Sequence, residues 1–309
     1  MQQVTARDFA TSFGTTAEDL STQCLKAIAE SDFSYRHFTR IERDAVILEV
    51  LRKIKHDTQV IAAPERKGVW ECGWAENLEM FKQSGFDPRS LVPKFLRENQ
   101  PIRFNGDYIL PANARFEYDY MTVFRLWLFQ KYFARTDCVY EFGCGTGLNL
   151  VMLANLWPAR TYYGLDFVPS AVDLVNSIGR HTPWDIRGRL FDMTQPDADF
   201  QLEKNAGVLT FGALEQLASR YEAFIQYLLT QKPAVVIHVE PTIELYDENV
   251  LFDHLAIEFH RKRGYSERLL PYLQNLEKRG ALEMLKIKRL NFGSLFMEGY
   301  TCMVWKPCG

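Results

Sequence analysis

The sequence predicts an α/β protein in which a mostly parallel β-sheet carries helices on both faces and follows a mainly helical N-terminal part. From about residue 135 onward, short apolar runs with strand spacing alternate with stretches of helical spacing. This alternation is typical of parallel strands joined by helices. The first 134 residues lack it and show apolar residues at three- and four-residue intervals. We therefore expect two domains, residues 1–134 and residues 135–309.

Size and charge limit the class of protein. The chain has 309 residues, of which 47% are hydrophobic and 24% are charged, as in globular proteins with a sizeable core. Its net charge of −3 argues against a nucleic-acid partner, because neutralising phosphates requires a basic surface. Two short basic runs, residues 261–263 and 286–289, are more simply explained as solvated faces.

The cysteines and the N-terminus favour a cytoplasmic protein. Six cysteines show neither paired nor metal-ligand spacing, which is typical of reduced thiols. Residues 1–8 lack the apolar core of a signal peptide, and no run reaches membrane-spanning length. We expect a cytoplasmic location and no membrane partner. The sequence does not indicate an oligomeric state.

Helical spacing predicts two N-terminal helices, over residues 16–30 and 39–55. The second is expected to bury an apolar stripe formed by Ala45, Val46, Leu48, Leu51 and Ile54. Residues 69–74 interrupt the helical pattern before a short helix over 75–83. In this interruption Trp70 and Trp74 either fill the core of the N-terminal part or line a substrate loop.

Residues 108–133 are unusually rich in aromatic side chains. The second half of this segment has helical spacing and is expected to pack against the sheet that begins at Val139. Its first half, residues 113–120, would then lie close to the end of the first strand.

That first strand ends in a glycine-rich turn. The turn runs from Glu141 to Gly147 with glycines at alternate positions, and a helix begins near Leu148. Such glycines allow a tight turn and a close approach of a ligand to the backbone. A dinucleotide fingerprint would require another glycine at the position of Leu148. The carboxylate of Glu141 would also repel a pyrophosphate and suits a cation. S-adenosylmethionine has a sulfonium, an ammonium and no phosphate, so it matches this turn better than a dinucleotide does.

The turn resembles the first motif of class I S-adenosylmethionine-dependent methyltransferases, acidic-x-Gly-x-Gly-x-Gly, at every position. The resemblance covers about residues 139–306. It implies a Rossmann-like, seven-stranded, mostly parallel sheet with an antiparallel strand near the C-terminus. It also implies that S-adenosyl-L-methionine is the cofactor and that the turn binds it through Glu141, Gly143, Gly145 and Gly147. The first 130 or so residues resemble no family that we can identify.

The second strand, expected at residues 161–166, ends in another carboxylate. Asp166 lies 19 positions after Gly147, close to the distance of about 20 residues at which an acid binds ribose in such folds. Capping the helix that begins near Ser170 is the alternative role. The resemblance implies that Asp166 binds the ribose of the cofactor and that Phe167 lies beside it.

The third strand, expected at residues 188–191, is followed by Asp192 and Met193. The resemblance implies that the acid accepts a hydrogen bond from the adenine amino group and that the apolar neighbour lies against the ring. Asp192 could equally cap a turn. In the resembled family, segments in the position of residues 113–120 often lie over the cofactor, so Tyr120 and Arg115 are further candidate contacts.

The fourth strand, expected at residues 207–211, runs into a Gly-x-Leu-Glu sequence that ends in Glu215. This resembles the turn at which the methyl group and the acceptor meet, and it makes Phe211 a candidate cofactor contact. A fifth strand over 234–240 ends in Glu240. Because ligands bind beyond the carboxyl ends of parallel strands, both glutamates should face the site.

Methyl transfer requires an acceptor atom in line with the methyl group and, for a hydroxyl or protonated amine, a base. We expect the base to be Glu215 or Glu240, with His254 as the next candidate. Oxygen ligands for a metal are numerous, but none has diagnostic spacing. We therefore expect no metal. Two long helices over 249–264 and 267–278 and two strands over 284–290 and 300–305 complete the pattern.

The sequence therefore predicts a cytoplasmic S-adenosylmethionine-dependent methyltransferase, a transferase, of a small-molecule acceptor such as a sugar, an amino acid or a natural-product intermediate. A methyltransferase of RNA or protein, with residues 261–263 as a docking patch, is the alternative. A protein that binds the cofactor without catalysis is a third hypothesis. The acidic composition and the lack of a recognisable RNA-binding module favour the small-molecule acceptor.

Overall fold

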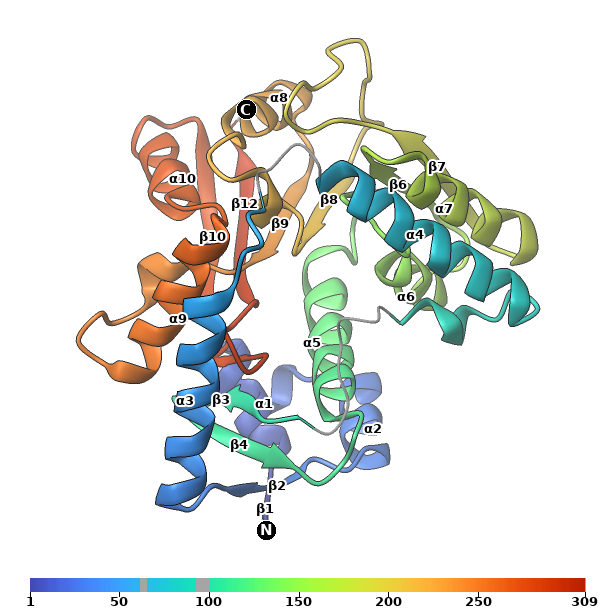
Figure 1. Ribbon diagram of the computed structural model, residues 1–309. Helices are drawn as coiled ribbons and strands as arrows, with labels where there is room; N and C mark the ends of the chain where they lie inside the picture. Colours follow the sequence, from blue (N-terminus) through green and yellow to red (C-terminus); the bar gives the residue numbers. More distant parts are fainter. Residues whose placement is uncertain (62–65, 93–99, 309) are drawn as a thin grey trace.

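The computed structural model describes residues 1–61, 66–92 and 100–308. Its centre is a seven-stranded sheet with the strand order β10-β12-β9-β8-β5-β6-β7 (Figure 1). Strands β5 to β9 run parallel, whereas β12 is antiparallel to both β9 and β10. This arrangement confirms the predicted Rossmann-like fold class. The strands of the sheet are β5 (Cys138–Phe142), β6 (Thr161–Asp166), β7 (Asp185–Leu190), β8 (Ala206–Phe211), β9 (Val235–Glu240), β10 (Leu282–Arg289) and β12 (Thr301–Pro307).

Helices cover both faces of this sheet, as the alternating pattern predicts. Neighbouring residues of a strand point to opposite faces, so Val139 and Tyr140 belong to two different cores. The core that contains Val139 includes α5 (Phe116–Tyr132), α6 (Leu148–Leu156) and α7 (Pro169–His181). The core that contains Tyr140 includes α8 (Glu222–Gln231) and α10 (Leu269–Lys278).

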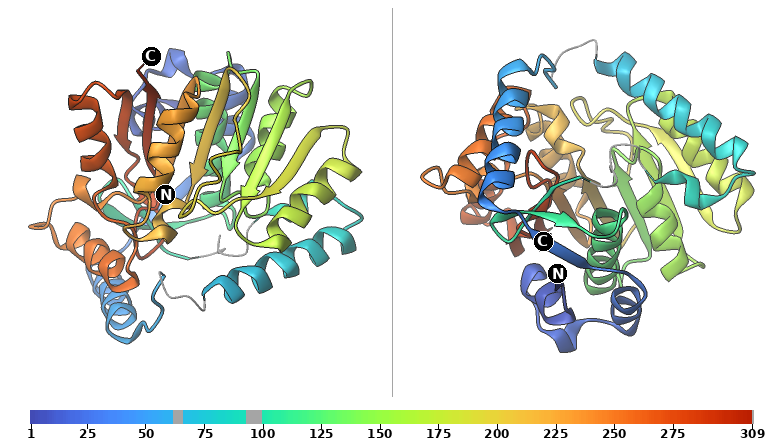
Figure 2. Two further views of the ribbon diagram at one scale, coloured as in Figure 1. Left: turned by 90° about the horizontal axis from the view of Figure 1, so that it is seen from above. Right: turned by 60° about the horizontal axis from the view of Figure 1, so that its bottom comes forward.

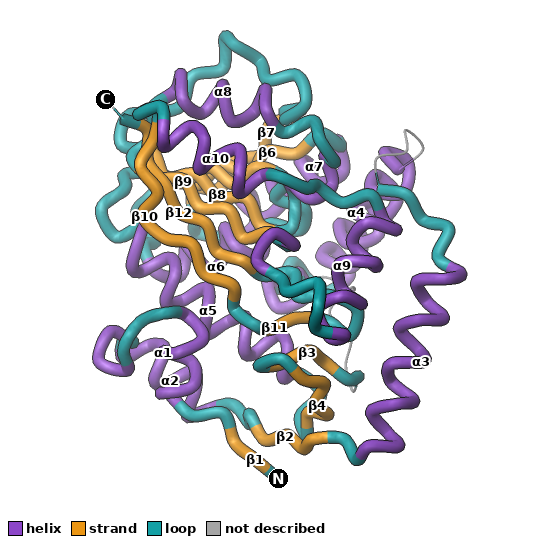
Figure 3. The backbone as a smooth tube through the Cα atoms, turned by 90° about the vertical axis from the view of Figure 1, so that its left-hand side faces the viewer, coloured by secondary structure: helices purple, strands orange, loops and turns teal. Residues whose placement is uncertain are grey.

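A second, smaller sheet lies in the N-terminal part and was not predicted. Its strand order is β1-β2-β4-β3-β11, and all its pairs are antiparallel (Figure 3). Strand β11 comes from the segment between β10 and β12, so the C-terminal part completes this N-terminal sheet. The strands are too short to produce a periodic signal, which explains why the sequence did not reveal them. They are β1 (Gln2–Gln3), β2 (Ser34–His37), β3 (Ile102–Phe104), β4 (Asp107–Pro111) and β11 (Phe292–Gly293).

The N-terminal helices only partly follow the prediction. They are α1 (Ala6–Phe13), α2 (Thr22–Glu30) and α3 (Arg40–His56), together with a short 3-10 turn η1 (Ala17–Asp19). Helix α3 begins where predicted, at a capping box formed by Thr39 and Glu42. The predicted apolar stripe is wrong in part, because Leu48 and Leu51 are exposed. Val46 and Val50 instead pack on α9 (Leu251–Arg263).

Helix α4 (Arg66–Gln83) is longer than predicted, and the expected interruption at residues 69–74 is wrong. A glycine inside a helix costs only about 1 kcal/mol relative to alanine, which packing can offset. Helix α4 obtains that packing by lying along α7, away from α1 and α2 (Figure 2). In the described residues, no helix is both long and apolar enough to cross a membrane.

Candidate active site

A cleft lies at the carboxyl ends of β5, β6 and β8, with α4 on its outer side. It consists of two adjoining cavities of about 300 and 370 Å³. Both cavities are lined by Trp70, Trp74, Gly143, Gly212 and Gln216. Parallel strands present ligands at this edge of a sheet, so the cleft is the expected place for a site.

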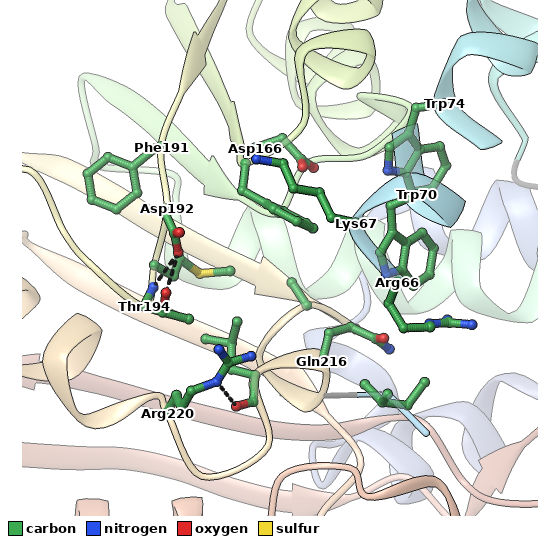
Figure 4. Close-up of a pocket in the computed structure, with 17 residues that line it drawn as sticks. Arg66, Lys67, Trp70, Trp74, Asp166, Phe191, Asp192, Thr194, Gln216 and Arg220 are labelled. Carbon is green, nitrogen blue, oxygen red and sulfur yellow. Dashed lines mark hydrogen bonds between the residues drawn. The ribbon is translucent and has the colours of Figure 1, made fainter. Parts of the chain in front are cut away.

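The first cavity brings together five predicted cofactor contacts, namely Gly143, Asp166, Phe167, Asp192 and Met193. Figure 4 shows Trp70 and Trp74 on one side of this cavity and Asp192 on the other. The two indole rings stack with their centroids 5.7 Å apart. They are half-buried and line the cleft from a helix, which favours the substrate-side interpretation of these tryptophans over the core-filling one.

Asp166 ties the second strand to the glycine turn. Its carboxylate is 4% exposed and accepts hydrogen bonds from the backbone N–H of Gly145 at 3.1 Å and of Val168 at 3.3 Å. Burial raises the pKa of Asp166 to about 6, and these hydrogen bonds oppose the shift. The bond to Val168 lies just before α7, whose first turn has no side-chain cap, so the alternative capping role is not observed.

Asp192 closes a turn, which is one of the two roles considered for it, and it also lines the first cavity. One carboxylate oxygen accepts hydrogen bonds from the backbone N–H and the hydroxyl of Thr194, at 2.8 and 2.7 Å, and so closes a turn. The residue is exposed and lines the first cavity, where its carboxylate can accept a hydrogen bond from a ligand.

The glycine turn needs its glycines for two reasons. Gly143, Gly145 and Gly147 all have φ between 51° and 73°, a region that other residues rarely adopt. A Cβ at Gly143 would lie 2.4 Å from Ala213, and one at Gly145 would lie 2.9 Å from the ring of Trp74. The backbone and α4 therefore approach each other too closely for a side chain.

Next to the turn, Asn149 joins two buried charged groups. Its amide Nδ2 donates to Glu141 Oε1 at 2.6 Å, and its Oδ1 accepts from Arg125 Nε at 2.6 Å. Glu141 and Arg125 are 2% and 5% exposed. Glu141 Oε2 and Arg125 Nη1 have no hydrogen-bond partner within the described part of the chain. One acceptor and one donor of opposite charge are thus left free, both facing the second cavity.

Burial dominates the electrostatics of this pair. It raises the pKa of Glu141 to about 8, although Asn149 and the positive charge of Arg125 act in the opposite direction. Such an arrangement favours a ligand that brings an ammonium to Glu141 and a carboxylate to Arg125.

The sequence did not single out Arg125 or Asn149. A signal was present, because each is a polar residue at a buried position of an otherwise apolar helix segment. Buried polar residues of this kind need partners, but sequence alone does not reveal that the two are hydrogen-bonded to each other.

Glu215 lies in the 3-10 turn η3 (Leu214–Leu217) and lines the second cavity. It is 9% exposed, and its Oε1 accepts a hydrogen bond from Gln216 Nε2 at 2.6 Å. Burial and then the nearby charge of Glu240 raise its pKa to about 8. A carboxylate with such a pKa can exchange a proton with a ligand near neutral pH.

Glu240 is not among the residues that line the cleft. It is fully buried and accepts hydrogen bonds from three backbone N–H groups, those of Ala213 at 3.2 Å, Leu214 at 3.1 Å and Glu215 at 3.2 Å. Glu240 thus fixes the backbone of the turn that carries Glu215, and any effect on the cleft is exerted through that turn.

The structure does not bring Tyr120 or His254 into the cleft. Tyr120 is fully buried, stacks on Phe292 with centroids 3.8 Å apart and donates its hydroxyl hydrogen bond to Ser12 at 2.6 Å. The side chain of Tyr120 therefore points from α5 into the core of the N-terminal part and not into the cleft. His254 is exposed on α9 and faces solvent. Of the other predicted contacts, Phe211 lines the second cavity beneath the guanidinium of Arg125, which lies 4.6 Å from the ring centroid.

A metal centre finds no support among the residues that the structure describes. No group of three or more His, Cys, Asp or Glu side chains is placed there to hold an ion. The carboxylate of Asp253 forms an ion pair with Arg289 at 2.5 Å.

No protein family model matches the chain, and no curated protein sequence matches it. Solved structures that resemble it include human N-acetylserotonin methyltransferase in complex with S-adenosylmethionine, 11% identical over 97% of this chain and 74% of that chain, with a TM-score of 0.43. An O-methyltransferase of a polyketide synthase multienzyme from Brevibacillus brevis, in complex with S-adenosyl-L-homocysteine, is 14% identical over 59% and 70% of the two chains, with a TM-score of 0.41. The cyclase SpnF is 12% identical over 78% and 96%, with a TM-score of 0.48. At such low identity the likeness is limited to the arrangement of helices and strands.

Proposed function

We propose that the protein is an S-adenosylmethionine-dependent methyltransferase of a small-molecule acceptor. The observation that carries this proposal is the pair of free, buried groups beside the glycine turn. Glu141 Oε2 and Arg125 Nη1 are complementary to the ammonium and the carboxylate of an amino acid. Asp166 and Asp192 line the adjoining cavity, where ribose and adenine would find hydrogen-bond acceptors. The residues present therefore fit both ends of this cofactor.

In this assignment the protein mainly positions the reactants. When bound, the cofactor supplies a methyl group that its sulfonium has already activated. The glycine turn and the Asn149 bridge hold the amino-acid end, and α4 covers the cleft with Trp70 and Trp74. Glu215 faces the second cavity and can take a proton from the acceptor. Glu240 is a positioning residue, because it fixes the backbone of Glu215.

A small acceptor is favoured over RNA or protein by the state of the basic run 261–263. Arg263 forms an ion pair with Asp57 at 2.6 Å, and its side chain is 12% exposed. Arg261 pairs with Glu248 at 3.3 Å. Arg263 is therefore engaged within the fold and Arg261 in a surface ion pair, which leaves less of the run for phosphate. The cleft is lined largely by aromatic and apolar side chains, as small-molecule sites usually are. The unpaired cysteines, four of them buried, agree with a cytoplasmic location.

The test is the transfer of a radiolabelled methyl group from S-adenosylmethionine into a fractionated metabolite pool, with RNA and protein fractions assayed in parallel. We expect label in a small-molecule fraction. Gly145→Asp should abolish the transfer, whereas Gly68→Ala, at a helical position with open space around it, should not. Label found only in RNA or protein would contradict the proposed acceptor class.

A further inference from the structure

The second cavity contains two buried carboxylates besides Glu141. Glu117 on α5 is 7% exposed and Glu215 is 9% exposed, and both line the cavity. Glu117 Oε1 accepts a hydrogen bond from the hydroxyl of Tyr300 at 3.3 Å, while its Oε2 has no partner in the described residues. A buried carboxylate oxygen without a partner is costly, so a ligand that donates to it is expected.

Three arginines line the same cavity, and none of them forms an ion pair with Glu117 or Glu215 in the described part of the chain. Arg125 is held by Asn149 and, in the proposed function, pairs with the carboxylate of the cofactor. Arg263 is paired with Asp57. Arg66 lies on α4 with its guanidinium over the ring of Trp70, 5.2 Å from the centroid, and its Nε has no hydrogen-bond partner in the described residues. Within the described residues, no cation lies within ion-pair distance of Glu117 or Glu215.

The other side chains that line the second cavity also suit a cation. Phe259, Tyr265 and Phe296 line it, and the rings of Phe259 and Phe296 stack with centroids 5.1 Å apart. Aromatic faces attract cations through their quadrupole. Gln216 also contributes an oxygen, Oε1, that has no partner in the described part of the structure. The free polar atoms of these groups are therefore acceptors of hydrogen bonds.

We propose that the acceptor is a small-molecule amine, whose nitrogen is held by Glu117 and Tyr300 and is deprotonated by Glu215. This inference rests on the proposed methyltransferase function and adds the substrate class. An ammonium donates three hydrogen bonds and neutralises buried negative charge. An alcohol has no positive charge to offset the negative charge that Glu117 and Glu215 carry when ionised, and an acidic acceptor would be repelled by the ionised groups.

Atoms and charges balance in the proposed methyl transfer. The substrate ammonium gives one proton to the carboxylate of Glu215, which frees the lone pair of the nitrogen. That lone pair forms a bond to the methyl carbon, and the bond between this carbon and sulfur breaks, with its electron pair remaining on sulfur. The product is a methylammonium ion, whose charge Glu117 stabilises. Glu215 then releases its proton to solvent.

The effect of ligand charge on binding can be measured with three ligands of similar shape and different charge, namely 2-phenylethylamine, 2-phenylethanol and phenylacetate. Each is titrated calorimetrically into the protein saturated with S-adenosylhomocysteine. We expect the amine to bind at least tenfold more tightly than the alcohol, and phenylacetate to bind most weakly, since hydrogen bonds between charged groups are the stronger ones. Glu117→Gln should lower the affinity for the amine about tenfold and leave that for the alcohol unchanged.

The matched control is Glu258→Gln, a glutamate on α9 that does not line the cleft, and it should change neither affinity. Unchanged affinity for S-adenosylhomocysteine in Glu117→Gln would show that the site is intact. The inference is overturned if the alcohol binds as tightly as the amine, if Glu117→Gln leaves amine binding unchanged, or if the amine does not bind at millimolar concentration. Failure of S-adenosylhomocysteine itself to bind would instead overturn the proposed function.

Discussion

The two cavities of the cleft are assembled in different ways. One side of the first is formed by α4, and the other side by residues at the ends of β6, β7 and β8, which follow their strands directly in the sequence. The second collects Glu117 from α5, Glu215 from η3, Phe259 from α9 and Tyr300 from the start of β12. The strand-end side of the first cavity is thus a product of local backbone geometry, whereas the acceptor side of the second cavity is a product of tertiary packing. The two can be disturbed separately.

The largest expected effect comes from the glycine turn. Gly145→Asp should weaken the binding of S-adenosylhomocysteine more than 100-fold, on the order of 3 kcal/mol. The new side chain would meet the ring of Trp74, require φ of 51° and place a further negative charge beside Asp166. Calorimetric titration gives the affinity, with Gly68→Ala as the glycine control. Equal affinity in Gly145→Asp and the unchanged protein would exclude the turn from the binding site.

The next effect separates turnover from binding. Glu215→Gln should lower kcat about 100-fold, which is at the lower end for the loss of a positioned base, without changing the affinity for S-adenosylhomocysteine. Steady-state rates with the acceptor found in the labelling experiment measure this effect. Glu258→Gln should retain full activity. An unchanged kcat in Glu215→Gln would remove this residue from the mechanism.

A smaller effect is expected at Arg125. Arg125→Met should lower the affinity for S-adenosylhomocysteine about tenfold, because the ligand carboxylate loses its charged partner. The affinity for 5′-methylthioadenosine should not change, because this ligand lacks the amino-acid end. Comparing the two ligands by calorimetry controls for any general disturbance of the cleft. Equal losses for both ligands would contradict the assignment of Arg125.

The pH profile should report Glu215 and its neighbour Glu240. Glu215 accepts a proton only when ionised, and burial raises its pKa to about 8. The value of kcat/KM should therefore rise with pH about tenfold per unit and level off above about pH 8. Glu240→Gln removes a negative charge that raises the pKa of Glu215, so the rising limb should move to lower pH. A limb that stays in place would show that Glu240 has no electrostatic role.

The smallest effect concerns stability without ligand. The pKa of Glu141 is raised from 4.5 to about 8 in the folded state, so between these values the folded state binds more protons than the unfolded one. Stability should fall as pH rises through this window and become constant above it. Melting temperatures at pH 5.5 and pH 8 measure this trend, which Glu141→Gln should flatten. S-adenosylhomocysteine should raise the melting temperature more at pH 8 than at pH 5.5, because its ammonium then pairs with ionised Glu141.

The first cavity could be predicted from the sequence because its determinants are local. Glycines at fixed spacing, and acids that directly follow strands, occupy the same places in the structure as in the pattern. Gly143, Asp166 and Asp192 all line this cavity, and the parallel direction of β5 to β9 follows from the alternation of strands and helices.

The second cavity could be predicted only in part. Glu141, Gly145 and Glu215 line it as predicted site residues, whereas distant contacts place Glu117 and Tyr300. The segment that leads to Tyr300 is anchored by Glu298, which forms an ion pair with Arg289 at 2.6 Å. Arg289 in turn pairs with Asp253. Tyr120 illustrates the same limit, since its helix was predicted but the face that it occupies was not. Periodicity places a residue on a helix, whereas packing decides what that residue contacts.

The most direct measurement is an experimental structure with S-adenosylhomocysteine bound. We expect the adenosine in the cavity lined by Asp166 and Asp192, the ammonium within hydrogen-bond distance of Glu141 Oε2 and the carboxylate at Arg125 Nη1. The sulfur should then point toward the part of the second cavity that is lined by Glu117, Glu215 and Tyr300. A ligand bound outside this cleft, or bound with its amino-acid end in the cavity of Asp192, would contradict the proposed function.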